Sequence, residues 1–425
     1  MINKPDGFIL RGDLCFSLNP QTLRCVENGY LVCTDGLSQG VFEALPERFE
    51  NLPLFDYGGK LIVPGLTDLH THAPQYAFRG LGMDLELLDW LKTYTFREEA
   101  KYADLEYAKR AYAAVVRDML KGPNTRVCLF ATVHLPATEL LMDMLEESGL
   151  VCLVGKVNMD RNSPADIREE NAARAAADTR RWLEYCAGRY RNAAPILTPR
   201  FVPTCSDTLL WELSALQKEF RVPVQSHLSE NRGEIKWVSQ LSPSSGFYGE
   251  VYEQCGLLGG DVPTIMAHCV WSGPDEIELL RRKGVYAAHC PQSNENLSSG
   301  IAPVRRLLDN GVKTGLGSDV AGGCHTSIFR AMADAISVSK LRFVYEGDAP
   351  LTVNEAFYMG TLGGGSFFGK AGSFEAGYEL DALVIDDSSL AAPFPLTIEE
   401  RLARVIHLSD DRHIFKKYVR GCSVL

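Results

Sequence analysis

The sequence predicts an α/β protein: a (β/α)8 barrel with a small discontinuous β-sandwich domain built from both chain ends. Two observations predict this. Short apolar runs alternate with amphipathic stretches through the middle of the chain, and β-like runs separated by turn residues fill its ends. A chain of 425 residues is long enough for both parts. We therefore expect residues 1–61 and 370–425 to form the β domain and residues 62–369 to form the barrel.

The charge and composition of the chain argue against several classes of partner. The formal net charge is −11 and there is no long basic run, which disfavours nucleic acid and anionic membranes. No apolar run reaches the ~20 residues that cross a bilayer. The 12 cysteines form no C-x-x-C pair, and the N-terminal MINKPDGF lacks the pattern of a secretory signal. We expect reduced thiols, a cytoplasmic location and a small neutral or cationic substrate.

Short β-like runs at both chain ends predict the small domain. FIL, YLVC and GVFEAL lie between Gly7 and Lys60, separated by Gly, Asp, Asn and Pro. Similar runs return at Glu379–Ile385 and Lys417–Leu425. Neither end is long enough to hold a core alone, so we expect the two to pack together.

Eight strand-like runs in the middle of the chain predict the barrel. Helical stretches separate them, which is the pattern of βαβ units around a parallel sheet. Eight such units indicate a TIM-like barrel, whose chemistry lies at the carboxyl ends of the strands. The candidate strands are Leu66–His72, Arg126–Val133, Val151–Met159, Pro195–Phe201, Val222–Leu228, Thr264–Cys269, Val285–Cys290 and Lys313–Val320.

The stretch that begins at Asp104 is typical of the helices between these strands. Asp104 can cap a helix. Apolar residues then recur at three- and four-residue steps, which places them on one face. We expect this face to be core; it carries Leu105, Ala108, Tyr112, Val115 and Met119.

The first barrel strand carries a candidate metal site. In LIVPGLTDLHTH, Pro64 and Gly65 break an apolar run, and the next strand ends at His70 and His72. Alternate residues on a strand point the same way, so the two imidazoles form half of a divalent metal site. Alone, His-x-His is a weak signal, because a solvated surface pair has the same spacing.

Other polar residues at strand ends strengthen this prediction. Strand eight, KTGLGSDV, ends in Asp319, so a carboxylate joins the imidazoles at the barrel mouth. Such a ligand set suits Zn²⁺, with Fe²⁺ and Mn²⁺ also open. For any single histidine, the alternative is a structural role in the core with its ring nitrogens hydrogen-bonded. That alternative does not account for five histidines at strand ends together. Of the nine histidines, those at or near strand ends are His70, His72, His227, His268 and His289.

Two further residues are candidates for catalysis. Glu230 follows His227 by three residues, in SHLSENR, and can face the metal without binding it. A carboxylate there takes a proton from the attacking water and passes it to the leaving group. The alternative is a solvated loop glutamate next to Arg232. We interpret His289 as a hydrogen-bonding partner of the attacking oxygen, with metal ligation as the second interpretation.

These motifs resemble the amidohydrolase superfamily. The resemblance rests on PGLTDLHTH, the His-x-x-Glu at 227–230, His268, AHCPQSN at 288–294 and GLGSDVAGG at 315–323. Further motifs resemble its guanine-acting branch and run from Leu61 to Ser366. These are HAPQYAFRG, LLDWLKTYTF, FATVH, VGKVNMD, LTPRF, SHLSENR and TLGGGS.

The resemblance implies a zinc-dependent hydrolytic deamination of guanine to xanthine and ammonia. In it, a zinc-activated water attacks C2, Glu230 shuttles the protons, and Asp319 orients the nucleophile. It also implies a homodimer. The residues that it implies as ligands of one zinc per chain are His70, His72, His227, His268 and Asp319.

The resemblance also implies which residues meet the purine. Arg200 offers a planar fork of donors, Phe201 an apolar face, and Gln75 both a donor and an acceptor. A surface salt bridge is the alternative for Arg200, and core packing for Phe201. We also expect His227 and Trp90 beside the substrate.

Trp90 and Phe96 could form a lid over the pocket, with core helix packing as the alternative.

Glu295 stands where a leucine-like residue is usual, and KGPNTRVCLFATVH replaces a Thr-rich start of strand two. Because these departures lie around the expected pocket, 8-oxoguanine or a pterin is an alternative to guanine as the substrate. Strand four has no lysine to bridge two metals and Lys156 lies on strand three, which favours one metal. A non-catalytic assembly protein is the remaining alternative.

Overall fold

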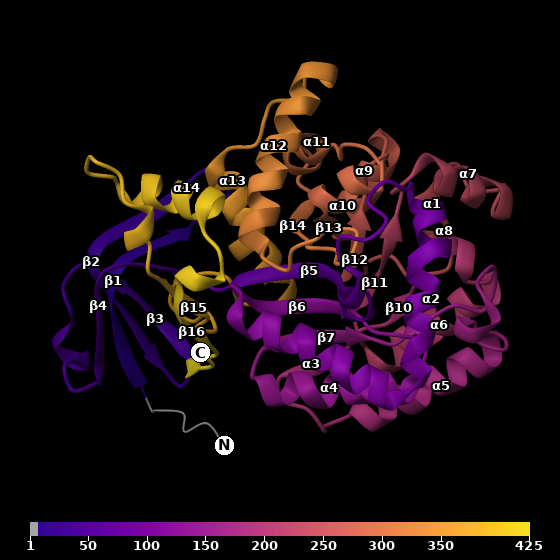
Figure 1. Cartoon of the computed structure of the whole chain (residues 1–425), viewed down its shortest axis with the longest axis horizontal. Helices are drawn as coiled ribbons and strands as arrows, with labels where there is room; N and C mark the ends of the chain where they lie inside the picture. Colours follow the sequence, from indigo (N-terminus) through magenta and orange to yellow (C-terminus); the bar gives the residue numbers. More distant parts are fainter. Residues whose placement is uncertain (1–6) are drawn as a thin grey trace.

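The middle of the chain forms the predicted barrel of parallel strands (Figure 1), in a computed structural model that describes residues 7–425. One half is the sheet β5-β6-β7-β9 and the other is β11-β12-β13-β14. Backbone hydrogen bonds join the halves on both sides, from Gln225 N to Leu197 O (2.9 Å) and from Asp319 N to His70 O (2.8 Å). Each predicted strand range overlaps one of these strands or the short pair β8 and β10. The barrel strands are β5 (Leu66–His72), β6 (Asn124–Phe130), β7 (Val151–Gly155), β8 (Val157–Asn158), β9 (Ala193–Pro195), β10 (Thr198–Pro199), β11 (Val224–Leu228), β12 (Thr264–His268), β13 (Tyr286–His289) and β14 (Lys313–Leu316).

Helices surround this barrel. In the part of the chain that is described, no helix is long and apolar enough to cross a membrane. The helices around the barrel and beside the small sheet are α3 (Leu105–Lys121), α4 (Leu135–Ser148), α5 (Ala172–Cys186), α6 (Asp207–Phe220), α7 (Arg232–Leu241), α8 (Tyr248–Gln254), α9 (Pro274–Lys283), α10 (Pro291–Asn296), α11 (Val304–Asp309), α12 (Ile328–Glu346), α13 (Val353–Tyr358) and α14 (Ile398–Leu408).

Helix α3 begins as predicted. The side chain of Asp104 accepts hydrogen bonds from the backbone N–H groups of Glu106 and Tyr107, at 2.9 and 3.3 Å. One residue of the predicted core face is wrong: Leu105 is 46% exposed. Its side chain points back past the start of the helix, beyond the buried stripe. The confirmed core residues are Ala108, Tyr112, Val115 and Met119.

Both chain ends contribute to one seven-stranded sheet with the order β17-β16-β15-β4-β1-β2-β3. Strand β15 pairs directly with β4 and so joins the two chain ends in this sheet. The boundaries at residues 61 and 370 stay a prediction, and residues 1–6 lie outside the described residues. The strands are β1 (Gly7–Ser17), β2 (Leu23–Thr34), β3 (Leu37–Phe42), β4 (Leu54–Pro64), β15 (Ala382–Ile385), β16 (Ile414–Val419) and β17 (Cys422–Ser423).

A buried ion pair ties this sheet to the base of the barrel. Arg126, at the start of β6, donates from Nε to Asp381 Oδ2 at 2.7 Å, and both side chains are 1% exposed. Its Nη2 donates to Glu379 at 2.8 Å. From β16, the buried Lys417 donates to the carbonyls of Met119 and Gly122 at the end of α3. Burial lowers the pKa of Lys417 to about 7.

We expect Arg126→Met to lower the free energy of unfolding by about 3–5 kcal/mol, because the Asp381 carboxylate would stay buried without its counter-charge. The matched control is Arg420→Met, since Arg420 pairs with Glu379 at 3.1 Å but is 31% exposed. An exposed pair contributes about 0–1 kcal/mol. Urea unfolding of the two variants checks this, and equal losses would contradict the prediction.

A helical segment between β5 and α3 lies over the mouth of the barrel. It consists of a 3-10 turn (Ala73–Phe78), α1 (Leu87–Trp90), a π turn (Leu91–Thr95), α2 (Phe96–Ala100) and a 3-10 turn (Lys101–Ala103). A π turn inside a helix frequently marks a functional position.

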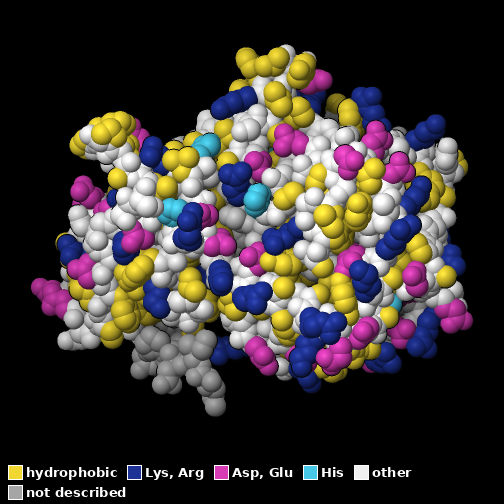
Figure 2. Space-filling view, in the orientation of Figure 1, with side chains coloured by type: hydrophobic (Ala, Val, Ile, Leu, Met, Phe, Trp, Pro, Cys, Tyr) yellow, Lys and Arg dark blue, Asp and Glu magenta, His cyan; other side chains and the backbone are white. Residues whose placement is uncertain are grey.

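The molecular surface carries charges of both signs. Figure 2 shows Lys and Arg side chains interspersed with Asp and Glu on the visible face, without one continuous basic area.

Candidate metal centre and active site

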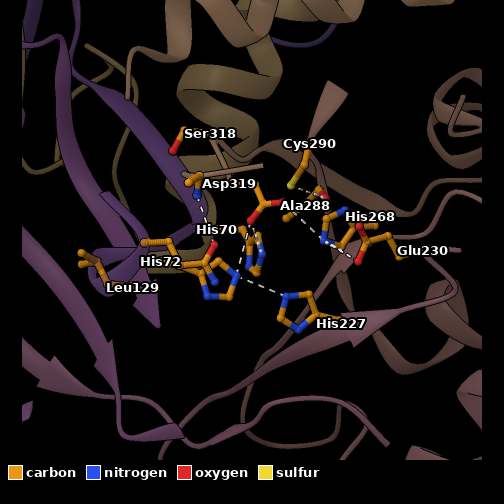
Figure 3. Close-up of polar contacts among 12 residues, drawn as sticks. His70, His72, Leu129, His227, Glu230, His268, Ala288, Cys290, Ser318 and Asp319 are labelled. Atoms are coloured by element: carbon orange, nitrogen blue, oxygen red, sulfur yellow. Dashed lines mark hydrogen bonds and ion pairs between the residues drawn. The ribbon is translucent and has the colours of Figure 1, made fainter. Parts of the chain in front are cut away.

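Polar side chains from four barrel strands point toward one another at the barrel mouth (Figure 3). His70 and His72 end β5, His227 lies near the end of β11, His268 ends β12, and Asp319 follows β14. The backbone bends sharply there, with a φ of 74° at His268 and 44° at Asp319. Such non-glycine conformations cluster at functional sites, where the surrounding structure holds them.

The ligand atoms of this cluster lie close together. Asp319 Oδ1 is 3.2 Å from His70 Nε2 and 3.4 Å from His72 Nε2. His72 Nε2 is 3.3 Å from His227 Nε2. Asp319 Oδ2 is 3.7 Å from His268 Nε2. One nitrogen from each of His70, His72 and His227 falls within 4.8 Å of the others, a spacing that a single metal ion can fill.

The surroundings of the imidazoles fit a bound cation. His227 Nδ1 is 2.6 Å from the carbonyl of Arg200, and His268 Nδ1 is 2.9 Å from Asn294 Oδ1. Both partners are acceptors, so Nδ1 carries the proton and the Nε2 lone pairs face the cluster. His70 is fully buried, yet neither ring nitrogen makes a hydrogen bond. Lone pairs that face one another repel unless a cation lies between them.

The protonation states of the cluster also suit a metal. Burial lowers the pKa of His70, His72 and His227, so these rings are neutral. Burial by itself would raise the pKa of Asp319, but His70, His268 and His72 hold it well below its usual value. Neutral imidazoles with an ionised carboxylate are the states in which these groups bind zinc.

Glu230 lies beside the cluster. Its Oε2 is 3.4 Å from His268 Nε2, and its Oε1 accepts a hydrogen bond from Ser299 at 3.2 Å. Its backbone N–H donates to Glu234 at 3.0 Å, which fixes the loop. Burial, and then the negative charge of Asp319, raises the pKa of Glu230 well above its usual value. A carboxyl with a raised pKa is able to take up and return a proton near neutral pH.

Three residues singled out in the sequence lie away from this centre. The expected contact of His289 with the attacking oxygen is wrong, because its ring lines a separate cavity between α11 and α12. Successive strand residues point to opposite sides, so the next residue, Cys290, faces the cluster. Lys156 pairs with Glu169. Glu295 is absent from the cavity walls.

A cavity opens onto the cluster, with about 390 Å³ of empty space that includes its open mouth. All five residues expected beside the substrate line it, together with Glu230. Phe96 does not; the Arg200 guanidinium lies 5.3 Å above the centre of its ring. The lining residues are His72, Gln75, Leu87, Trp90, Leu91, Arg200, Phe201, His227, Glu230, His268, Leu297 and Asp319.

Sequence reasoning missed two residues that support this site. Glu99, on α2, accepts hydrogen bonds from Gln75 Nε2 at 3.0 Å and from Arg200 Nη1 at 2.5 Å. Asn294 holds His268 in its orientation. Asn294 lies in the AHCPQSN motif, which is a signal that could have found it, whereas FREEA gives no such signal for Glu99.

Known proteins resemble this chain in sequence and in architecture. The profile of the amidohydrolase family matches residues 61–422. Guanine deaminases from Dictyostelium discoideum and Homo sapiens are 40% and 38% identical over 381 and 379 residues, covering 88% and 86% of this chain and 84% and 83% of theirs. A solved guanine deaminase from C. acetobutylicum with bound guanine is 46% identical, with a TM-score of 0.96 over 99% of this chain and all of that one. These findings confirm the resemblance seen in the motifs. The chain belongs to the amidohydrolase family.

Proposed function

We propose that this protein hydrolyses guanine to xanthine and ammonia with one Zn²⁺ per chain. One observation carries the proposal: a single cavity is lined by four members of the histidine–aspartate cluster, by the buried Glu230, and by Gln75 and Arg200. Hydrolytic deamination needs these three elements, which are a metal to activate water, a proton carrier and groups that orient the ring.

The metal would be held by the five clustered residues. A bound divalent ion supplies a water whose pKa falls from about 15.7 toward about 7, so that attack is feasible at neutral pH. Cys290 also lies near, but burial raises the pKa of its thiol well above its usual value, so we do not propose it as a ligand. The proposed ligands are His70, His72, His227, His268 and Asp319.

Glu230 moves the protons of the reaction. Its carboxylate takes one proton from the attacking water while the C2–O bond forms. It delivers that proton to the ring nitrogen next to C2. It then takes the second proton from the new C2 hydroxyl and passes it to the amine, as the C2 carbonyl forms, the C2–N bond breaks and ammonia leaves. Asp319, as a buried carboxylate close to the same space, accepts a hydrogen bond from the attacking oxygen and fixes its direction.

Other cavity residues bind the ring and exclude water. Arg200 and Gln75 present N–H donors to the purine, and Phe201 offers an apolar face. Leu87, Trp90 and Leu91 cover the site from the helical segment above the barrel. Trp90 is held in place because its Nε1 donates to the carbonyl of Leu81 at 3.1 Å.

Steady-state ammonia release from guanine tests the proposal. We expect fast turnover of guanine and about one zinc per chain by metal analysis. The comparison substrates are 8-oxoguanine, isoxanthopterin, adenine and cytosine. If another of these rings is turned over and guanine is ignored, the metal chemistry stands and the choice of ring is wrong. The homodimer and the cytoplasmic location stay predictions.

A further inference from the structure

We propose that Glu99 is a positioning residue which aims the donors of Gln75 and Arg200, and thereby sets which purines the cavity accepts. This inference rests on the proposed function. Glu99 is 2% exposed, belongs to α2, and is not among the residues that line the cavity. Its carboxylate therefore acts through the two side chains that it holds.

Two contacts fix the side-chain amide of Gln75. Its Oε1 accepts a hydrogen bond from the backbone N–H of Ala321 at 3.2 Å, and its Nε2 donates to Glu99 Oε1 at 3.0 Å. Rotating the amide by half a turn would set the NH₂ group against the Ala321 N–H and the carbonyl against the carboxylate. Both contacts would become repulsive, so the second Nε2 hydrogen keeps one direction.

The other carboxylate oxygen of Glu99 holds Arg200. It accepts a hydrogen bond from Nη1 at 2.5 Å, and the Arg200 side chain is 3% exposed. One of the five guanidinium N–H donors is thus used, and the others stay available beside the cavity. The carboxylate also compensates a buried positive charge, which would be costly to leave unpaired. A neutral ring can then occupy the cavity.

The result is an array of donors that requires acceptors on the substrate. Guanine carries a carbonyl oxygen at C6, where adenine has an amino group and unsubstituted purine has hydrogen. A ring without that carbonyl leaves buried donors unpaired, which costs about 1–3 kcal/mol. Glu99 lies in the same helical segment as Trp90 and Leu91, which line the cavity, so the array is oriented only while this segment covers the site.

Inhibition by hypoxanthine and by purine tests this role, because the first keeps the C6 carbonyl and neither carries the C2 amine. Glu99→Gln puts an NH₂ group where one carboxylate oxygen stood, so only one of the two contacts can remain. We expect the hypoxanthine Ki and the guanine KM to rise about tenfold or more. The purine Ki should change by less than about twofold, and kcat should fall less than KM rises.

The matched control is Glu98→Gln. Glu98 is the adjacent residue and pairs with Lys101 at 2.6 Å instead. We expect its inhibition constants, metal content and melting temperature to match wild type. Equal changes in both inhibition constants of Glu99→Gln, or no change, would overturn the positioning role. Failure of the wild type to release ammonia from guanine would overturn the proposed function instead. If Glu99→Gln does not fold, Glu99→Asp is the second variant, because it keeps the charge but shortens the side chain. We expect it to lose part of the preference for hypoxanthine over purine. An unchanged preference in that variant would also overturn the positioning role.

Discussion

Glu230→Gln should lower kcat for guanine by at least about two orders of magnitude, the range expected for a positioned acid–base group. The amide has nearly the same shape and can still accept a hydrogen bond from Ser299, which lies 3.2 Å from the carboxylate. It cannot take a proton from water and return it to the amine. The variant should therefore fold, bind metal and bind guanine while turning over slowly. Steady-state kinetics with metal analysis of the same preparation measure this.

Glu295→Gln is the matched control for that experiment. Glu295 is exposed on the nearby helix α10 and does not line the cavity. We expect its kcat to stay within about twofold of wild type, as is usual for substitutions that touch no reacting group. Near-normal turnover in Glu230→Gln would refute the proton-transfer assignment. Loss of metal from that variant would mean that Glu230 is a ligand.

The cluster of ligands could be predicted from the sequence because each part has a local signature. Alternation along a strand puts His70 and His72 on one side, and the barrel topology brings the ends of distant strands to one rim. The same rule explains the error at His289. A strand residue and its neighbour point to opposite sides of the strand. At the end of β13 the side chain that faces the cluster belongs to Cys290, one residue later than predicted, so His289 faces away from it.

Glu99 could not be predicted, for a different reason. Its partners are 24 and 101 residues away, in other parts of the barrel rim. Nothing in its own helical segment distinguishes it from the neighbouring Glu98, which carries the same side chain and pairs with Lys101. Which of two adjacent carboxylates turns inward depends on how that segment seats over the barrel, and a π turn at Leu91–Thr95 alters the helical phase just before them.

Asp319→Asn should abolish tight metal binding and lower kcat by at least about two orders of magnitude, because the only carboxylate among the proposed ligands would be lost. A second readout is independent of activity. A metal bound to the folded state at one hundred times its dissociation constant stabilises that state by about 2.7 kcal/mol. Adding Zn²⁺ to chelator-treated wild type should therefore raise its melting temperature, and the rise should vanish in Asp319→Asn.

The control for this last prediction is Asp386→Asn, which removes a carboxylate from the small sheet, where it pairs with Lys60 at 2.5 Å. It should keep both metal content and the Zn²⁺-induced rise in melting temperature. A rise of wild-type size in Asp319→Asn would mean that the imidazoles alone hold the ion and that Asp319 acts only on the attacking oxygen. The Asp319→Asn substitution should leave the orientation of His227 and His268 unchanged, because Arg200 O and Asn294 hold their Nδ1 atoms. The experiment therefore isolates what the charge of Asp319 contributes.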